Sequence, residues 1–193
     1  RKELRFPLRE RTLLMAGIKK SSSELGRITP DEYAAGERSK VVLVVDSVRS
    51  LHNVGSFFRT ADAFDIEAVW LCGITATPPN RDIHKTALGA ELNVEWRYFD
   101  KCTDALAELR SKGYGLYCVE QTFGSVMLGD FEVDPDGRYA LVVGNEVDGV
   151  SQEAVDMCDG AIEIPQSGVK HSLNVSVAAA VVLWHFYERM HLR

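Results

Sequence analysis

The sequence predicts an α/β fold in which a mostly parallel sheet is covered by helices on both faces. Two continuous apolar runs rich in β-branched residues, at 41–45 and 139–143, are typical of buried parallel strands. Each run is followed by a polar or glycine-containing loop and then by a helix-like segment. The same order recurs after the apolar run at 161–164. Repeated alternation of this kind is the pattern of parallel α/β domains.

The first 39 residues are predicted to be a basic and mostly helical extension before a single domain at 40–193. We expect one helix over residues 1–20, interrupted near Pro7, and a second from Thr29, which can act as its N-cap. Residues 1–27 hold eight Lys or Arg against three Glu, a net charge of +5. The whole chain carries −6, which leaves −11 for the remainder. The extension could grip nucleic-acid phosphates, or it could be a solvated helix without a specific partner.

Beyond residue 40 the elements are expected in alternation. The predicted strands are 41–46, 66–72, 96–99, 115–119, 139–143 and 161–164, and the predicted helices are 53–64, 103–111 and 174–190. Residues 77–80 and 124–137 are expected to be loops, because both contain clustered Pro, Gly, Asn or Asp. The last helix is apolar on nearly all sides, which indicates burial either wholly within one monomer or partly against a second copy.

Composition excludes several classes of protein. The chain has 193 residues, 46% hydrophobic and 26% charged, which suits one globular domain. It has no apolar run of the roughly 18 residues that a membrane span needs, and no signal-peptide core. Its four cysteines are widely spaced, which favours reduced thiols in a cytoplasmic protein over a disulfide framework or a zinc site. We assign no metal, and the absence of G-x-G-x-x-G disfavours a Rossmann cofactor site.

Three short motifs follow predicted strands. They are Asn-x-Gly-x-x-x-Arg at 53–59, Gly-Asn-Glu-x-x-Gly at 144–149, and Ile-Pro at 164–165 with Ser-Leu-Asn-Val-Ser at 172–176. Ligands of open α/β sheets bind at the carboxyl ends of the strands, where such loops present backbone N–H and C=O groups. The motifs therefore predict a binding site at this edge of the sheet.

Together the three motifs resemble the signature motifs of the SpoU (TrmH-like) branch of the SPOUT RNA methyltransferases, over about residues 40–187. The resemblance implies an enzyme that transfers a methyl group from S-adenosylmethionine to a ribose 2′-hydroxyl of RNA. It also implies that the C-terminal segment forms a deep trefoil knot. A homodimer through the knot region and the last helix is implied as well, with the active site shared across the interface.

The resemblance implies that Gly144, Ile164 and Leu173 contact the cofactor, with Val143 and Asn145 beside the glycine. A glycine lets the backbone approach a ligand closely, although a simple strand-end turn is an alternative reason for Gly144. Ile164 and Leu173 can give apolar contact to adenine, and their backbone groups can bond its edge.

The resemblance assigns catalysis to Arg59, with Asn53, Glu146, Ser172 and Asn174 around it. In that family, this arginine is often described as the base that activates the 2′-hydroxyl. A guanidinium is effectively always protonated, so Arg59 could instead grip the adjacent phosphate and stabilise the developing alkoxide. Asn53 could be only the N-cap of its helix, Glu146 a solvated loop charge, and Ser172 partly an N-cap.

Three functions stay open. A ribose 2′-O-methyltransferase is favoured, because every polar residue of the motifs is present. The others are an RNA-binding or assembly protein that lost catalysis, and a methyltransferase of another acceptor such as a base nitrogen. About 40 residues precede the first motif, too few for the separate RNA-binding domain of many rRNA-modifying members. We therefore expect tRNA rather than rRNA as the substrate, although the acidic body is unusual for such an enzyme.

Overall fold

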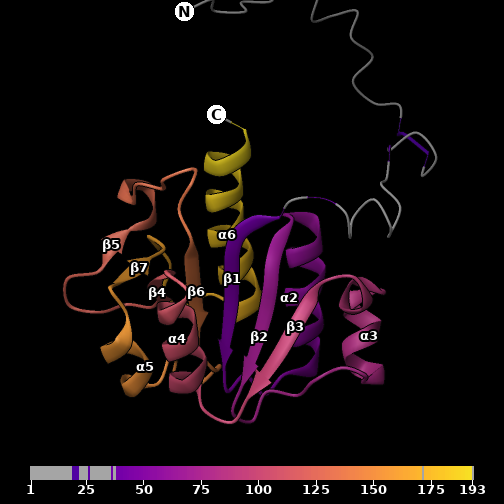
Figure 1. Cartoon of the computed structure of the whole chain (residues 1–193), viewed down its shortest axis with the longest axis horizontal. Coiled ribbons are helices and arrows are strands. Elements are labelled where there is room, and N and C mark those ends of the chain that lie inside the picture. The colour runs from indigo at the N-terminus through magenta and orange to yellow at the C-terminus, as the bar shows by residue number, and fades with distance from the viewer. Residues whose placement is uncertain (1–18, 22–25, 27–35, 37, 171, 193) are drawn as a thin grey trace, which may run out of the picture. The chain divides into compact units, whose positions relative to one another are not determined.

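The computed structural model describes residues 19–21, 26, 36, 38–170 and 172–192 (Figure 1). Backbone contacts divide the chain into residues 1–36 and residues 37–193, and everything below concerns the second unit. Of the helix predicted over 1–20, only residues 19 and 20 are described, and the helix predicted from Thr29 lies outside the described residues. The roles expected of the basic extension stay predictions.

A seven-stranded sheet forms the centre of the described domain, and every pairing in it is parallel. Its strands are β1 (Ser39–Asp46), β2 (Ile66–Cys72), β3 (Glu95–Phe99), β4 (Gly115–Val119), β5 (Val126–Met127), β6 (Tyr139–Val143) and β7 (Gly160–Glu163). The order across the sheet is β3-β2-β1-β6-β4-β7-β5. The predicted parallel α/β fold is confirmed, and the trefoil knot stays a prediction.

The strand order places the three motifs together. The strands β2 and β3 lie in sequence on one side of β1, and β6 pairs with β1 on its other side. This is a topological switch point, where adjacent connections leave to opposite sides and a crevice opens beyond the carboxyl ends. The first motif follows β1 and the second follows β6, and these two strands are neighbours. The third motif follows β7, with β4 between it and β6.

Helices cover both faces of the sheet, as predicted. They are α2 (Leu51–Ala63), α3 (Arg81–Ala87), α4 (Cys102–Ser111), α5 (Gln152–Met157) and α6 (Val175–His191), with short 3-10 turns η2 (Ala90–Leu92) and η3 (Leu128–Asp130). Figure 1 shows α4 and α5 in front of the sheet and α2 and α6 behind it. Because both faces are covered, the six residues 41–46 of β1 are all buried, which explains the uninterrupted apolar run.

Two segments differ from expectation. The helix α3 and the turn η2 fill a region for which the sequence predicted no element, and α3 buries only Ile83 and Ala87. Seven residues with two buried positions give no readable helical period, and the helix depends instead on the side chain of Asn80 as its N-cap. The loop expected at 124–137 contains the short strand β5 and the turn η3.

The last helix is buried on one side and exposed on the other. Ala179, Val182, Leu183 and Phe186 are buried within the chain. Val177, Val181 and Trp184 lie on its other side with 48%, 38% and 44% of their surfaces exposed. No helix in the described part of the chain is long and apolar enough to cross a membrane.

Candidate functional site

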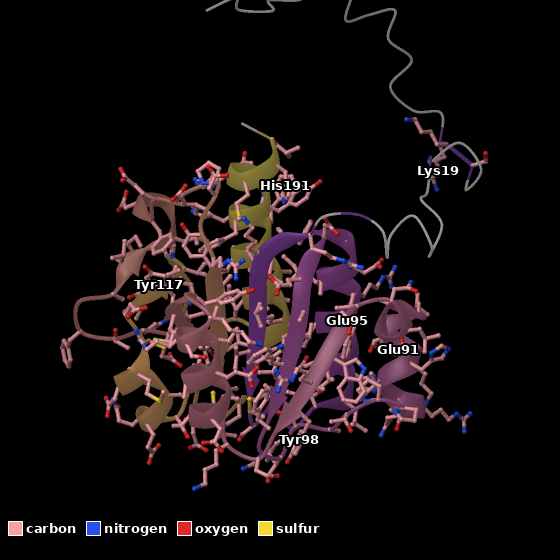
Figure 2. The ribbon with its side chains drawn as sticks, in the orientation of Figure 1. Lys19, Glu91, Glu95, Tyr98, Tyr117 and His191 are labelled. Atoms are coloured by element: carbon pink, nitrogen blue, oxygen red, sulfur yellow. The ribbon has the colours of Figure 1, made fainter. Side chains whose placement is uncertain are left out.

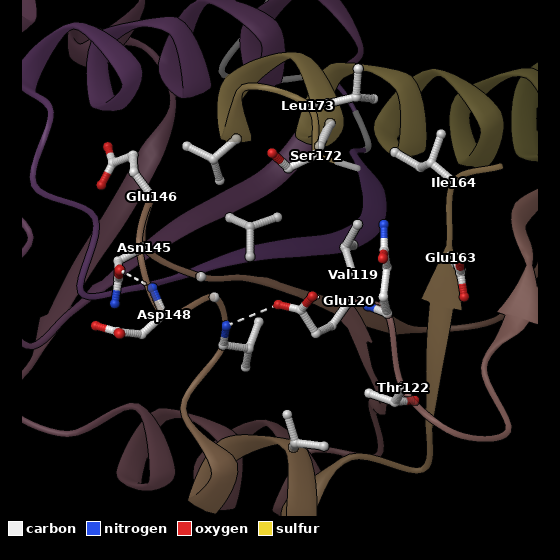
Figure 3. A pocket seen from close by; sticks show the side chains of 18 of the residues that line it. Val119, Glu120, Thr122, Asn145, Glu146, Asp148, Glu163, Ile164, Ser172 and Leu173 are labelled. Atoms are coloured by element: carbon white, nitrogen blue, oxygen red, sulfur yellow. Dashed lines mark hydrogen bonds between the residues drawn. The ribbon is translucent and has the colours of Figure 1, made fainter. Parts of the chain in front are cut away.

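A cleft of about 1270 Å³ lies beyond the carboxyl ends of β4, β6 and β7, beside the start of α6 (Figure 3). Eight of the ten residues predicted for the site line it. These are Val143, Gly144, Asn145, Glu146, Ile164, Ser172, Leu173 and Asn174. The other two, Asn53 and Arg59, lie on α2 and are not among the residues that line it.

The second motif folds into a small closed loop. Asn145 and Gly149 exchange two backbone hydrogen bonds, of 3.0 and 3.2 Å. The side-chain oxygen of Asn145 accepts from the N–H groups of Val147 and Asp148, both at 2.8 Å. Gly149 has φ near +70°, and a Cβ on Gly144 would lie 1.9 Å from the carbonyl carbon of Gly149. Both glycines are therefore required by the loop itself, and the side chain of Asn145 is occupied inside it.

One chain of hydrogen bonds joins all three motifs. Glu146 accepts from Asn53 Nδ2 at 2.8 Å, and from the backbone N–H groups of Ser50 at 3.2 Å and Arg49 at 3.3 Å. The other end of the Asn53 amide accepts from Asn174 Nδ2 at 3.2 Å. The series Glu146–Asn53–Asn174 thus fixes the amide of Asn53 in one orientation, because its donor and acceptor ends are both used.

Glu146 is ionised within this series. Partial burial alone would raise its pKa, but hydrogen bonds from backbone N–H groups and from Asn53 outweigh that effect and hold the pKa below its usual range. The three hydrogen bonds that Glu146 accepts contradict the alternative that it is only a solvated loop charge. It connects the second motif to the start of α2.

The helix caps differ from the two that the sequence suggested. Ser50, not Asn53, is the N-cap of α2, and its side chain accepts from the Asn53 N–H. Asn174, not Ser172, is the N-cap of α6, where its oxygen accepts from the N–H of Ser176 at 3.0 Å and from its hydroxyl at 2.7 Å. Because α2 begins two residues earlier than predicted, the Asn53 side chain is free to join the motif network.

Arg59 stands apart from this network. Its side chain is exposed on α2, six residues beyond Asn53, which is about 9 Å along the helix axis. The structure therefore brings Asn53, Glu146 and Asn174 into contact but leaves Arg59 facing solvent.

The cleft has apolar walls and an acidic rim. Val143, Ile164 and Leu173 contribute apolar surface. The charged residues lining the described cleft are all carboxylates, namely Glu120, Glu146, Asp148 and Glu163. Such a cleft attracts cations and repels phosphates.

Two acidic residues at strand ends were missed by the sequence analysis. Glu120 follows β4, and its carboxylate accepts from the Val150 N–H at 3.2 Å, which ties the end of the second motif loop to the end of β4 (Figure 3). Asp46 ends β1 and accepts from the backbone N–H and hydroxyl of Ser151, at 3.0 and 2.6 Å, which ties β1 to the start of α5. The available signal was their position at the carboxyl ends of predicted strands.

The fold and the site together define a parallel α/β protein with a ligand cleft at a topological switch point and three interconnected motif loops. Residues 40–184 match the model of the SpoU rRNA Methylase family, and the chain belongs to this family. It is 33% identical over 153 residues to the 23S rRNA (guanosine-2′-O-)-methyltransferase RlmB of Xanthomonas axonopodis pv. citri. That match covers 79% of this chain and 59% of the relative, so the chain spans about three fifths of that relative's length.

Solved structures share the fold. The TrmH/SpoU tRNA modifying enzyme of A. aeolicus superposes with a TM-score of 0.72 and 28% identity, over 81% of this chain and 79% of that one. An AdoMet-bound rRNA methyltransferase from Sinorhizobium meliloti superposes with a TM-score of 0.74 and 24% identity, over 86% of this chain and 62% of that one. The second likeness is evidence for the fold alone.

Proposed function

We propose that this protein transfers a methyl group from S-adenosylmethionine to a ribose 2′-hydroxyl of RNA. The observation that carries the proposal is the hydrogen-bonded series Glu146–Asn53–Asn174, which joins three motifs beside a cofactor-sized cleft. Family membership supports it, and so does the name of the relative RlmB, a 23S rRNA (guanosine-2′-O-)-methyltransferase.

The cleft fits the proposed cofactor by the chemistry of its lining. S-adenosylmethionine combines an adenine ring with two cationic groups, a sulfonium and an ammonium, and supplies the methyl group. The apolar walls at Val143, Ile164 and Leu173 suit the ring, and the acidic rim suits the cations. Gly144 and Asn145 would offer backbone rather than side-chain contacts, since the Asn145 side chain is engaged in its own loop.

Asn53 and Arg59 would act on the RNA. The Asn53 amide is held in one orientation by Glu146 and Asn174, which suits it to position the reacting ribose. Ser172 lines the cleft with an exposed side chain that can contact either substrate. The always-charged guanidinium of Arg59 would bind the adjacent phosphate and stabilise the alkoxide that develops as the hydroxyl attacks.

A homodimer would complete this arrangement. Val177, Val181 and Trp184 form an exposed apolar stripe on α6, and Trp184 lies against the rings of Phe64 and Tyr187. Exposed apolar patches mark interaction sites. Because α2 packs against α6, a second copy seated on this stripe would lie beside the helix that carries Arg59.

We take tRNA as the first substrate to test and the cytoplasm as the location. Both a tRNA modifying enzyme of A. aeolicus and a 23S rRNA methyltransferase are similar to this chain, so rRNA is the second pool in the assay.

The test is a methylation assay. Purified protein is incubated with labelled S-adenosylmethionine and separate pools of unmodified tRNA and rRNA, and the products are digested to nucleosides. We expect a 2′-O-methylated nucleoside from the tRNA pool. Arg59→Ala should abolish it, and Arg59→Lys should restore little if the planar fork is needed. Lys101→Ala, which removes an exposed cation just before α4, should have no effect.

Other outcomes would select among the alternatives. A methylated base would contradict ribose as the acceptor and favour a base methyltransferase. RNA binding without cofactor binding would favour an RNA-binding or assembly protein that lost catalysis. Transfer to rRNA alone would reverse the order of the two RNA substrates but keep the reaction.

A further inference from the structure

A second cavity lies at the β3 edge of the sheet, whereas the cleft lies at the ends of β4, β6 and β7. It has a volume of about 520 Å³ and lies beside the edge strand β3, the helix α3 and the turn η2. Figure 2 labels Glu91 next to α3 at this edge. Its size falls within the roughly 300–1,000 Å³ of small-molecule sites. None of the three sequence motifs contributes to it.

Local hydrogen bonds hold the cavity walls in place. Asn80 caps α3 by accepting from the N–H groups of Asp82 at 2.9 Å and Ile83 at 3.4 Å. The buried Glu91 accepts from the Gly89 N–H at 3.1 Å and contacts His84 Nδ1 at 2.5 Å. The cavity is therefore formed before any ligand arrives, which limits the ordering cost of binding.

The charges at the cavity are arranged to receive an anion. Glu91 is the one carboxylate among the described lining residues, and only 6% of its side chain is exposed. Burial alone would raise the pKa of Glu91, but hydrogen bonds from His84 and from backbone N–H groups hold it below the usual range. His84 is 62% exposed, and because its Nδ1 contacts Glu91, Nε2 is the ring nitrogen left to bind a ligand. Arg81 is exposed on the same rim.

The remaining walls are apolar and partly aromatic. Trp96 is half-buried on β3, while Pro79 and Leu92 are exposed, Leu92 to 80%. The indole of Trp96 can pack against a flat heterocycle, and the basic side chains of Arg81 and His84 can bind a phosphate attached to it. Single-stranded RNA is bound in this way, with bases on aromatic side chains and phosphates on basic ones.

The cavity is rigidly connected to the helix of Arg59. Gly55 of α2 packs so closely on α3 that a Cβ there would lie 2.3 Å from the Ile83 carbonyl oxygen. The Thr86 hydroxyl of α3 also donates to the His52 carbonyl of α2 at 3.1 Å. An RNA strand that reaches Arg59 can therefore extend to the cavity along one packed helix pair.

We propose that this cavity binds one nucleotide of the RNA substrate outside the reacting one. The base packs against Trp96 and Leu92, and its phosphate is bound by Arg81 and His84. The proposal rests on the proposed function, because it requires that the protein binds RNA. It adds a recognition site remote from the cofactor cleft.

The first test separates RNA recognition from chemistry. In the methylation assay, the double variant Arg81→Ala/His84→Ala should raise KM for RNA about tenfold, as the loss of a charge-assisted contact predicts. Turnover at saturating RNA and the Kd of S-adenosylmethionine should stay within twofold of wild type. The control Lys40→Ala/Lys101→Ala removes two exposed cations elsewhere. A double variant whose KM equals that of this control would overturn the proposal.

The second test does not depend on methyl transfer. The indole N–H signal of Trp96, assigned with Trp96→Phe, is followed by NMR during titration with a single-stranded RNA hexanucleotide. We expect a saturable shift that Arg81→Glu abolishes. A shift in a protein that transfers no methyl group would support the cavity while the proposed function fails. RNA binding without any Trp96 shift would overturn the proposal, as would a shift that follows protein concentration alone and so indicates a second copy in the cavity.

Discussion

Replacing Glu146 with glutamine tests whether the charge at the junction of the motifs organises the site. The carboxylate accepts three hydrogen bonds, from Asn53 Nδ2 and from the backbone N–H groups of Arg49 and Ser50. A glutamine amide has one oxygen acceptor, and its NH₂ group would face other donors. At least one of the three donors is therefore left without its acceptor.

The expected loss of stability is modest. A hydrogen bond to a charged group contributes about 1.5–3 kcal/mol in general. Glu146 is exposed, and its two backbone bonds of 3.2 and 3.3 Å are long, so screening by water reduces the effect. We expect Glu146→Gln to lower the free energy of unfolding by about 1–2 kcal/mol. Turnover should fall by about 100-fold, because the Asn53 amide loses its fixed orientation.

The effect should depend on pH with a defined sign. Hydrogen bonds hold the pKa of Glu146 below its usual range, so its stabilising contribution is complete above the unfolded-state pKa of about 4.3. That contribution is lost as the pH falls through the folded-state pKa. The difference in unfolding free energy between wild type and Glu146→Gln should therefore be constant near pH 7 and shrink in acid.

Urea denaturation followed by circular dichroism at pH 7 and pH 4, together with steady-state turnover, measures both effects. Asp148→Asn is the matched control for stability, because it removes a carboxylate from the same exposed loop. Equal destabilisation by both variants at pH 7 would attribute the effect to net charge. A Glu146→Gln protein with wild-type turnover would refute the argument that the network orients Asn53.

Three further changes test other parts of the site. Gly144→Ala places a Cβ 1.9 Å from the Gly149 carbonyl carbon, so the melting temperature and the affinity for S-adenosylmethionine should both fall. Gly129→Ala is the control, because a Cβ there meets nothing within 4 Å, and it should leave that affinity unchanged. Glu120→Gln weakens the acceptor for the Val150 N–H and removes one negative charge from the acidic rim. Calorimetry should then show a several-fold weaker affinity for the cofactor, and an unchanged Kd would show that Glu120 does not contribute to cofactor binding. Val181→Glu puts a charge in the apolar stripe of α6, and light scattering should report a monomer, whereas a wild-type protein that is already monomeric would contradict the proposed dimer.

The predicted bounds of β2, β4 and β6 agree with the structure. In β2 and β6 nearly every residue is buried, which explains their continuous apolar runs, whereas β4 alternates between buried and half-buried residues. The helix α3 was not predicted, because seven residues with two buried side chains carry no clear period. Its position depends on contacts with α2 that no local pattern contains.

The residues of the site could be predicted from the sequence, but the hydrogen bonds between them could not. The motifs identified Asn53, Glu146 and Asn174, yet the hydrogen bonds between them cross 93 and 121 residues of chain. Only the adjacency of β1 and β6 and the docking of α6 bring them together. Local reading also misplaced the cap of α2 at Asn53 instead of Ser50.

The position of Asn174 at the start of the last helix has a consequence for biosynthesis. The sheet strands that carry the first two motifs are complete by residue 143, well before α6 is synthesised. The Asn53 amide obtains its second partner only when the final segment of the chain has docked. A chain that ends early could therefore form much of the sheet and still lack an organised site. Catalytic competence would then appear only in chains that have finished folding, which keeps incomplete products from binding RNA productively.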